Sequence, residues 1–409
     1  MAIQGLRATD NWQADQRPKD WNEAILLLFP NGMAPLTALR SMMKKKSTID
    51  PEFSWFEKRF DDQRLALNGN LDATGGTDTI TVVTGASGLK KDHLLYVEQT
   101  GELLLVNTDP TSETSISVTR GAAGTTVTAV TFNGAGVNPN LVVAGTAHME
   151  GSLAPTAISR NPSKLRNYTQ IFRNSLSMTR TAQQTRLRTG KQIAESKREA
   201  LEYHTVEMER AALFGVAFED LTGGSEPRRY SQGIFNFIDV NSPAENKINF
   251  QAHTAKDLQD LLNDLEILFR WGSQEKVGFC GNAALLNLNR LILAHPGTSI
   301  IVGPETKEYG MTVHKVMTPF GTLVLKSHPL FNRITSGVTA GTAYRAMDAA
   351  ILVMDMENIR YRYLDGSDTQ FKSNQETPGQ DAMVSGYLTE CGYEWHHAET
   401  FGYIKGFSA

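Results

Sequence analysis

Apolar positions recur at helical spacing in three segments of the chain. The longest runs from Gln192 to about Phe214, where apolar side chains recur on one face and charges of both signs lie on the other. A second helix is predicted from Leu258 to Phe269, with Thr254 and Asp257 as a capping box and Gly272 at its end. A third is predicted from Asn282 to Leu293, with Asn282 as its cap.

Shorter apolar runs predict strands between and around these helices. The segment from Phe53 to Phe60 is aromatic and strand-like, and the segment from Val277 to Cys280 is expected to be a buried strand. The remaining predictions are a hairpin of Met311–Val316 with Thr322–Leu325, a buried strand over Ala349–Met354, and a long strand from Met383 onwards. The pattern therefore predicts an α+β fold with helices packed on a mixed sheet.

The chain changes character between about Thr74 and Ala157. Thr, Val and Gly dominate this stretch, and short alternating or apolar runs recur between Gly, Asn, Asp and Pro residues. Strands of this length and spacing are typical of a small β-barrel or sandwich. The strand-like segments on either side, around Trp55 and from Tyr168 to Met178, resemble two legs of one hairpin. We therefore expect the β-rich stretch to be inserted at the tip of that hairpin.

The first fifty residues are expected to form an arm. An apolar stretch from Trp21 to Phe29 could form one or two helical turns, but Pro30, Gly32 and Pro35 end it. The lysine run at 44–46 is interpreted as solvated surface.

Composition limits the classes of protein to which the chain can belong. The 409 residues are 40% hydrophobic, and 40 basic against 44 acidic side chains give a net charge of −4. This balance excludes a protein that binds nucleic acid through its overall charge. The two cysteines, Cys280 and Cys391, cannot form a disulfide framework and are predicted to be buried thiols in a reducing cytoplasm. No stretch has the length of a signal peptide core or a membrane span, so no membrane association is expected.

Positive charge is concentrated in one segment that contains no acidic residue. Its basic residues are Arg160, Lys164, Arg166, Arg173, Arg180, Arg186, Arg188 and Lys191. Only Tyr168 and Phe172 could stack on bases there, whereas spaced arginines suit bidentate pairing with carboxylates. We therefore favour contacts with a neighbouring subunit over nucleic-acid binding, which stays open as the alternative.

Patterns that would indicate an enzyme are missing. Thr185 and Gln192 break the phosphate-loop pattern around Gly190 and Lys191. His204 and Glu207 are one helical turn apart, but a metal site needs a third ligand. No nucleophile motif or distinct carboxylate pair is present, although spatial triads can be hidden in a sequence. The sequence predicts no catalytic residue, no cofactor and no metal.

Several motifs, taken in order, resemble the major capsid proteins of tailed bacteriophages with the Hong Kong 97-type fold. They are TGELLLV at Thr100, VTRGAAGT at Val118, EGS at Glu150, AALFGVAFED at Ala211 with SQGIFNFI at Ser231, VHKVMTPFGTLVLKSHPLF at Val313, and the closing segment from Ala382. The chain is most similar to a branch with a β-rich insert in the E-loop, and the resemblance covers most of its length.

The resemblance implies a division of the chain into named parts. These parts are an N-terminal arm (1–52), E-loop legs (53–73 and 158–180), a β-rich insertion domain (74–157), a spine helix with the first part of a P-domain (181–252), an A-domain (253–350), and A/P-domain return strands (351–409). The residues expected at contacts between subunits are Trp55, Arg59, Arg166, Arg173, Arg180, Arg186 and Arg188.

The function implied is structural. A protein of this family self-assembles as hexamers and pentamers into an icosahedral head that encloses double-stranded DNA. Its expected partners are copies of itself, a separate scaffolding protein, portal and decoration proteins, and packaged DNA contacted without sequence specificity. The expected location is the virion, after assembly in the bacterial cytoplasm. The alternatives are an encapsulin-like nanocompartment shell and a soluble nucleic-acid-binding protein that uses residues 160–191.

Overall fold

The structure is a computed structural model that describes residues 38–59, 64–131, 139–159, 161–185, 192–222, 226–294, 301–302, 306–308, 311–332 and 347–407. The chain divides into two compact units. We call Met1–Trp55 with Lys164–Ala409 the main unit, and Phe56–Ser163 the β unit. The predicted helix of residues 21–29 lies outside the described residues.

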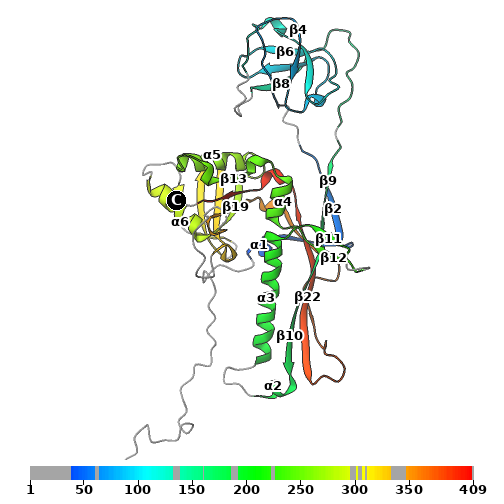
Figure 1. Cartoon of the computed structure of the whole chain (residues 1–409), viewed down its shortest axis with the longest axis vertical. Helices are drawn as coiled ribbons and strands as arrows, with labels where there is room; N and C mark the ends of the chain where they lie inside the picture. The colour runs from blue at the N-terminus through cyan, green and yellow to red at the C-terminus, as the bar shows by residue number, and fades with distance from the viewer. Residues whose placement is uncertain are drawn as a thin grey trace, which may run out of the picture. The chain divides into compact units, whose positions relative to one another are not determined.

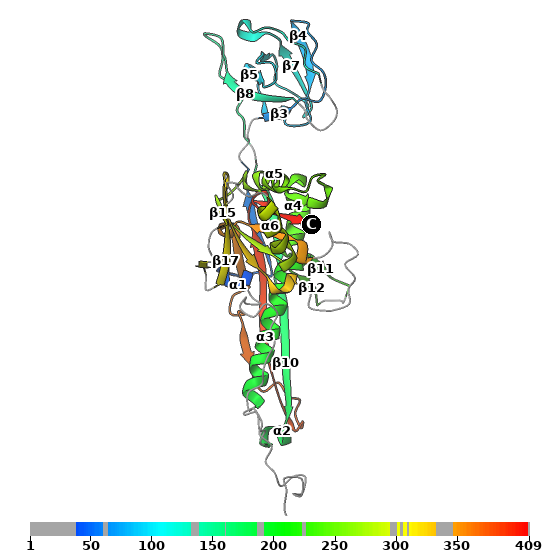
Figure 2. The same ribbon diagram turned by 90° about the vertical axis from the view of Figure 1, so that its left-hand side faces the viewer.

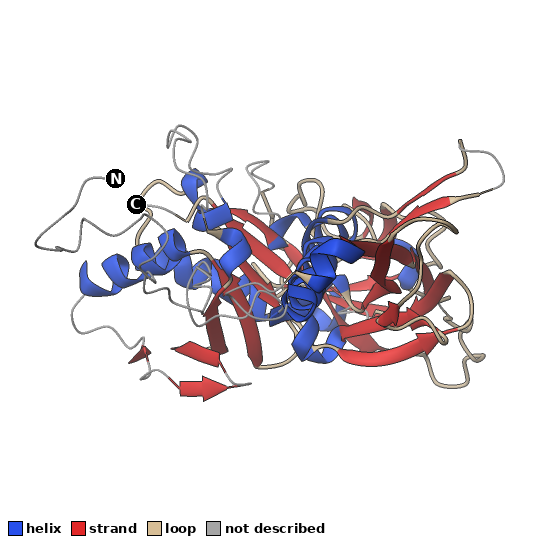
Figure 3. Ribbon diagram, turned by 90° about the horizontal axis from the view of Figure 1, so that it is seen from below, coloured by secondary structure: helices blue, strands red, loops and turns tan. Residues whose placement is uncertain are grey.

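Helices of the main unit cover two sheets, and helices and strands are mixed throughout (Figure 3). The helices are α1 (Ala38–Met42), α2 (Arg180–Gln184), α3 (Gln192–Phe214), α4 (Ile234–Asn241), α5 (Leu258–Phe269) and α6 (Asn282–Ala294). Short 3-10 turns lie at Ala244–Asn246, Phe250–Ala252, Pro329–Phe331, Met347–Ala349, Met356–Asn358 and Ala398–Thr400. The three helices predicted from apolar spacing are thus confirmed.

One sheet of the main unit has five strands. In order they are β1 (Lys44–Thr48), β20 (Ile359–Leu364), β22 (Ala382–Trp395) and β10 (Gln170–Thr179), with β21 (Gln370–Lys372) also paired to β22. α3 lies alongside β10 and β22 in both views (Figures 1 and 2). Alternate β10 residues Phe172, Leu176 and Met178 are buried, as a strand packed under a helix requires.

The other large sheet has eight strands and carries α5 and α6. Its order is β13 (Lys247–Asn249), β23 (Gly402–Lys405), β19 (Ile351–Met354), β14 (Glu275–Cys280), β18 (Gly321–Ser327), β17 (Met311–Thr318) and β15 (Ile301–Val302), with β16 (Thr306–Glu308) paired to β17. β17 and β18 form the predicted antiparallel hairpin. All four residues of β19 are buried, which confirms the predicted core strand.

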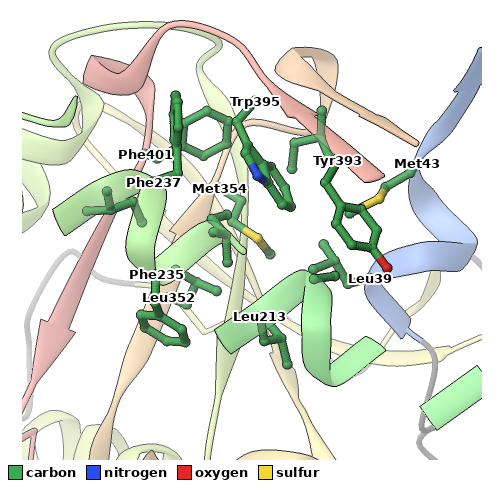
Figure 4. Close-up of a cluster of buried hydrophobic side chains, with 14 of the residues drawn as sticks. Leu39, Met43, Leu213, Phe235, Phe237, Leu352, Met354, Tyr393, Trp395 and Phe401 are labelled. Atoms are coloured by element: carbon green, nitrogen blue, oxygen red, sulfur yellow. The ribbon is translucent and has the colours of Figure 1, made fainter. Parts of the chain in front are cut away.

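Two cores hold the main unit together. The larger one joins α1, α3 and α4 to both sheets, and its aromatic side chains converge from distant parts of the chain (Figure 4). Phe237 of α4 meets Phe401 edge-on at 6.1 Å between ring centres. The second core lies under α5 and α6 and includes Leu258, Leu265 and Phe407.

A close backbone contact explains why two of the quoted motifs contain glycine. Gly215 follows α3, Gly233 precedes α4, and Gly233 N donates to Gly215 O at 2.9 Å. A Cβ atom on Gly215 would lie 2.2 Å from Ser231 O, and one on Gly233 would lie 2.6 Å from Gly215 N. Only glycine lets these two segments approach so closely.

The β unit has its own sheet and its own core. The strand order is β3 (Arg64–Ala66), β8 (Asn140–Thr146), β5 (His93–Val97), β6 (Leu103–Val106), β7 (Ser115–Thr119) and β4 (Thr77–Thr81). Short 3-10 turns lie at Ala86–Gly88 and Ala122–Gly124. Its core is made only of residues of this unit, from Leu65 to Leu141. Residues 126–131 are one of the short alternating runs that the sequence predicts as strands, but they form no strand and pair through an isolated bridge from Val130 to Leu71.

The hairpin legs differ from those predicted. Strand β2 (Glu52–Glu57) pairs with β9 (Ser163–Tyr168), whereas β10, predicted as part of the second leg, pairs along its whole length with β22. The reason is that the apolar side of β10 must cover α3. The residues from 64 to 73, predicted as part of the first leg, belong to the β unit instead, because Leu65, Leu67 and Leu71 are buried in its core. The predicted insert at 74–157 is therefore narrower than the compact unit of the structure.

The predicted arm (1–52) also differs, since its last part belongs to the main core. Leu39 is fully buried, and β1 pairs in parallel with β20 from Lys44↔Arg360 to Thr48↔Leu364. The lysine run forms an edge strand, and its three lysine side chains are exposed, as the interpretation as solvated surface requires.

Candidate assembly surfaces

Two of the predicted contact residues, Trp55 and Arg166, lie in the antiparallel ribbon of β2 and β9, and Arg59 follows two residues after β2. Hydrogen bonds join the two strands at both ends of the ribbon: Thr169 N donates to Pro51 O at 2.8 Å, and Ser163 Oγ donates to Glu57 O at 3.2 Å. Trp55 is only 8% exposed and stacks on His396 at 5.8 Å, so little of it is left for a neighbour. Arg59 is exposed, and Arg166 lies 3.6 Å from Glu52 of its own chain.

Strand β10 carries two more predicted contact residues on its solvent side. Arg173 is exposed, and within the described residues no hydrogen bond or ion pair is found for its guanidinium. Arg180, at the start of α2, pairs with Asp381 of its own chain at 3.0 Å. Both side chains of that pair are mostly exposed, so it contributes little to stability. Arg186 and Arg188 lie outside the described residues.

Cations also gather at the β1 edge of the five-stranded sheet. The parallel register places Lys44 beside Arg360 and Lys46 beside Arg362, with all four side chains on one face. Arg362 is neutralised by Glu394 at 2.5 Å, and Glu394 also accepts from His396. Burial would raise the pKa of Glu394, but these two partners lower it below its usual value. Lys45 points the other way and pairs with Asp368 at 3.2 Å.

A pocket of about 530 Å³ opens at the base of β9, where this strand lies near α4 and β11 (Phe218–Asp220). Strand β11 pairs with β12 (Arg228–Tyr230). Its walls include Leu165, Tyr168, Phe218 and Val240, and Lys164 and Arg166 supply cations at its rim. Phe218 is 57% and Val240 67% exposed, although both are apolar. The residues at 165, 218 and 240 are separated in sequence, so spacing alone could not have revealed this pocket.

A buried carboxylate in α3 joins three parts of the main unit. Glu209 is fully buried and accepts hydrogen bonds from Leu39 N at 2.6 Å, Arg40 N at 3.0 Å and His328 Nε2 at 3.1 Å. The first two bonds cap the start of α1, where the arm enters the structure. Glu209 therefore fixes the arm to the long helix and, through His328, to the eight-stranded sheet.

The pair once considered for metal binding serves a structural purpose. His204 is fully buried, and its two ring nitrogens bond to Asn174 Oδ1 at 2.6 Å and Thr389 Oγ1 at 2.7 Å. Burial, together with the charge of Arg40, lowers the pKa of His204. Since both nitrogens are occupied, this histidine links α3 to β10 and β22. In the described part of the chain, no group of three His, Cys, Asp or Glu side chains is placed to hold a metal ion.

The two cysteines are both buried, and burial raises the pKa of Cys280 to about 12 and that of Cys391 to about 11. Such thiols stay protonated near neutral pH and react slowly. Among the helices described, none is long and apolar enough to cross a membrane.

Comparison with known proteins gives a consistent result. The model of the family described as "SU10 major capsid protein" matches residues 4–408. The major capsid protein of Pseudomonas phage PaMx41 is 28% identical over 373 residues, which cover 89% of this chain and 82% of that protein.

Two solved structures are similar at low identity. The capsid of a native GTA particle is 9% identical, with a TM-score of 0.45 over 99% of this chain and 100% of that one. The SrpI encapsulin of Synechococcus elongatus PCC 7942 is 12% identical, with a TM-score of 0.38 over 60% of this chain and 76% of that one.

Proposed function

The chain belongs to the SU10 major capsid protein family, and from this premise we propose that it assembles as hexamers and pentamers into an icosahedral head around double-stranded DNA. As a phage major capsid protein, it is a structural component of the virion. The observation that carries the proposal is the family match over residues 4–408, which spans both the main unit and the β unit.

Features of the main unit support a role in assembly. Large apolar side chains are exposed at Ile49, Ile171, Phe218 and Val240, although the chain has ample core elsewhere. Phe218 and Val240 line the same pocket, and contiguous apolar surface of this kind marks contacts between proteins. The family match favours a phage head over the encapsulin-like shell. Arg166 and Arg180 already face carboxylates, which disfavours a nucleic-acid groove along residues 160–191.

The remaining partners belong to the same proposal. A separate scaffolding protein would guide assembly in the host cytoplasm, and portal and decoration proteins would join the shell. The parts named by the resemblance, including the β unit as an E-loop insertion, are proposed on the same basis.

Electron microscopy of the expressed protein tests the proposal directly. We expect closed shells or ring-shaped capsomers when the chain is produced with its scaffolding protein, and DNA inside heads recovered from infected cells. A monodisperse monomer at high concentration and physiological salt would contradict assembly. Shells that hold a protein cargo and no DNA would support the encapsulin-like alternative.

The substitution Arg173→Glu tests whether β10 contacts a neighbour. Because Arg173 is exposed, we expect the free energy of unfolding to change by less than about 0.5 kcal/mol. Assembly yield should fall severalfold, as measured by sedimentation of shells. Arg180→Glu is the matched control for an arginine that already has a carboxylate within the chain. Normal shells with weaker DNA retention would instead indicate a role in nucleic-acid binding.

A further inference from the structure

The turn between β1 and β2 presents an isoleucine to solvent on a rigid support. Ile49 is 95% exposed, the highest fraction among the exposed large apolar residues described. Two hydrogen bonds hold the turn: Thr48 Oγ1 donates to Asp50 O at 3.1 Å, and Glu52 N donates to Asp50 Oδ1 at 2.8 Å. Backbone bonds from Thr169 N to Pro51 O and from Asp365 N to Thr48 O fix both of its ends. Ile49 is therefore held outward by the fold.

Ile49 has an exposed carboxylate beside it in the sequence and a second exposed apolar side chain nearby. Ile171, two residues beyond the bond from Thr169 to Pro51, is 60% exposed. Asp50 is exposed next to Ile49, and Glu52 follows at the start of β2. We call residues 48–51 the Ile49 turn.

The pocket at the base of β9 is complementary to the Ile49 turn in both polarity and charge. Its walls are apolar, with Leu165, Phe218 and Val240, and the cation Lys164 at its rim is exposed. No ion pair is found for Lys164 within the described residues, and the carboxylate paired with Arg166 is Glu52, at the long distance of 3.6 Å. The one carboxylate of the lining, Glu219, is neutralised by Arg229 at 2.9 Å. The rim is thus left with positive charge.

We propose that the Ile49 turn of one copy of this chain docks into the pocket lined by Lys164, Leu165, Phe218 and Val240 on the next copy. Ile49 fills the apolar part of the pocket, and Asp50 approaches Lys164. The two surfaces differ, so the contact is head-to-tail, which is the type of contact that builds rings of identical copies. The inference rests on the proposed function, because a ring of identical copies is the capsomer of the shell.

Paired cysteines test the contact without interference from the native thiols, which are buried. Shells are prepared from Ile49→Cys, from Val240→Cys, from the double variant, and from a mixture of the two single variants. A short bis-maleimide then links cysteines that lie close together. We expect a ladder of covalent oligomers from the double variant, dimers only from the mixture, and none from each single variant.

Several outcomes would overturn the proposal. A double variant that links only within one chain, with no dimer from the mixture, would place the Ile49 turn in the pocket of its own chain. Shells without any cross-link would show that this contact does not form, while leaving the proposed function intact. A mixture of Val240→Cys with Leu286→Cys, an exposed position on α6, is the control. If this mixture gives as much dimer as the mixture of Val240→Cys with Ile49→Cys, the linking at Ile49 is unspecific and the proposed contact is not supported.

A substitution at the turn gives an independent measurement. Ile49→Asp leaves the fold unchanged, because the side chain makes almost no contact within its chain. Losing one buried isoleucine at each contact should raise the protein concentration needed for assembly about tenfold or more. Ile49→Leu should restore it. Assembly of Ile49→Asp at the wild-type concentration would overturn the proposal.

Discussion

At the scale of single residues, the buried cation Lys276 is held by backbone oxygens. Its Nζ donates to Leu268 O at 2.7 Å and Thr400 O at 2.8 Å, which ties the end of α5 to the closing segment of the chain. Burial lowers the pKa of Lys276 to about 8, although Asp355 opposes this shift. A neutral amine still has two donor hydrogens, one for each carbonyl, so losing the proton preserves both bonds.

The lowered pKa of Lys276 predicts a pH dependence of stability. Between about pH 8 and 10, Lys276 is protonated in the unfolded chain and neutral in the folded chain. The contribution of Lys276 to the free energy of unfolding therefore increases as the pH rises through this range, and it is lost as the pH falls through 8. The free energy of unfolding of the wild type minus that of Lys276→Met should therefore increase with pH, by at most about 1.4 kcal/mol per unit. Urea unfolding of unassembled protein at several pH values measures this difference. Lys372→Met, at an exposed position, is the control, and a flat difference curve for Lys276→Met would contradict the assignment.

A second prediction at this scale concerns Glu209. Replacing it with Ala leaves Leu39 N, Arg40 N and His328 Nε2 without their common acceptor in a buried place. We expect a loss of about 3 kcal/mol in the free energy of unfolding and faster proteolysis near Ala38. Glu207→Ala, an exposed carboxylate on the same helix, should cost less than about 1 kcal/mol. Equal effects of the two substitutions would mean that Glu209 does not anchor the arm.

At the scale of elements, the start of α5 shows how local signals decide a helix end. The sequence predicts a capping box of Thr254 and Asp257, but the structure begins α5 at Leu258 with Asp257 alone as its cap. Asp257 Oδ1 accepts from Asp260 N at 3.0 Å. Thr254 cannot cap this helix because Lys256 adopts a left-handed conformation, with φ of 53°, between the two residues.

This correction gives a direct comparison between the two residues. Asp257→Ala should lower the free energy of unfolding by about 1 kcal/mol, because one of the first N–H groups of α5 loses its acceptor. Thr254→Ala, at an exposed position outside the helix, should change it by less than about 0.5 kcal/mol. Chemical denaturation of both variants measures the difference. A larger cost at Thr254 would restore the predicted capping box.

The same scale shows how far the sequence can predict the structure. The long helix from Gln192, the hairpin of β17 and β18, and the buried strand β19 were predictable because spacing and turn residues act locally. The partner of β10 was not, because its alternation fits pairing with either β2 or β22, and only packing under α3 decides. The pocket and the Glu209 junction could not be predicted, because they join residues far apart in the chain.

At the scale of the whole molecule, the boundary between the two units decides what can be removed. The core of the β unit contains Leu65, Leu67 and Leu71, which precede the insert predicted at 74–157. Removing only residues 74–157 would expose these side chains to water. A cut after Glu57 and before Ser163 removes the whole core, and Ser163 Oγ bonds to Glu57 O at 3.2 Å, so the two new ends are close together.

The final prediction follows from this boundary. Replacing residues 58–162 with a short Gly-Ser linker should leave the main unit folded, because each of its two cores is made only of its own residues and a short closure costs little. The whole β unit, produced alone as residues 56–163, should fold cooperatively around its own core. Circular dichroism and thermal unfolding test both proteins. The shorter cut at 74–157 is the control and should aggregate, because Leu65, Leu67 and Leu71 lose their partners. If the 58–162 and 74–157 deletion proteins unfold and aggregate to the same extent, the β unit does not begin near Phe56. If the 58–162 deletion unfolds the main unit, the two units share a core.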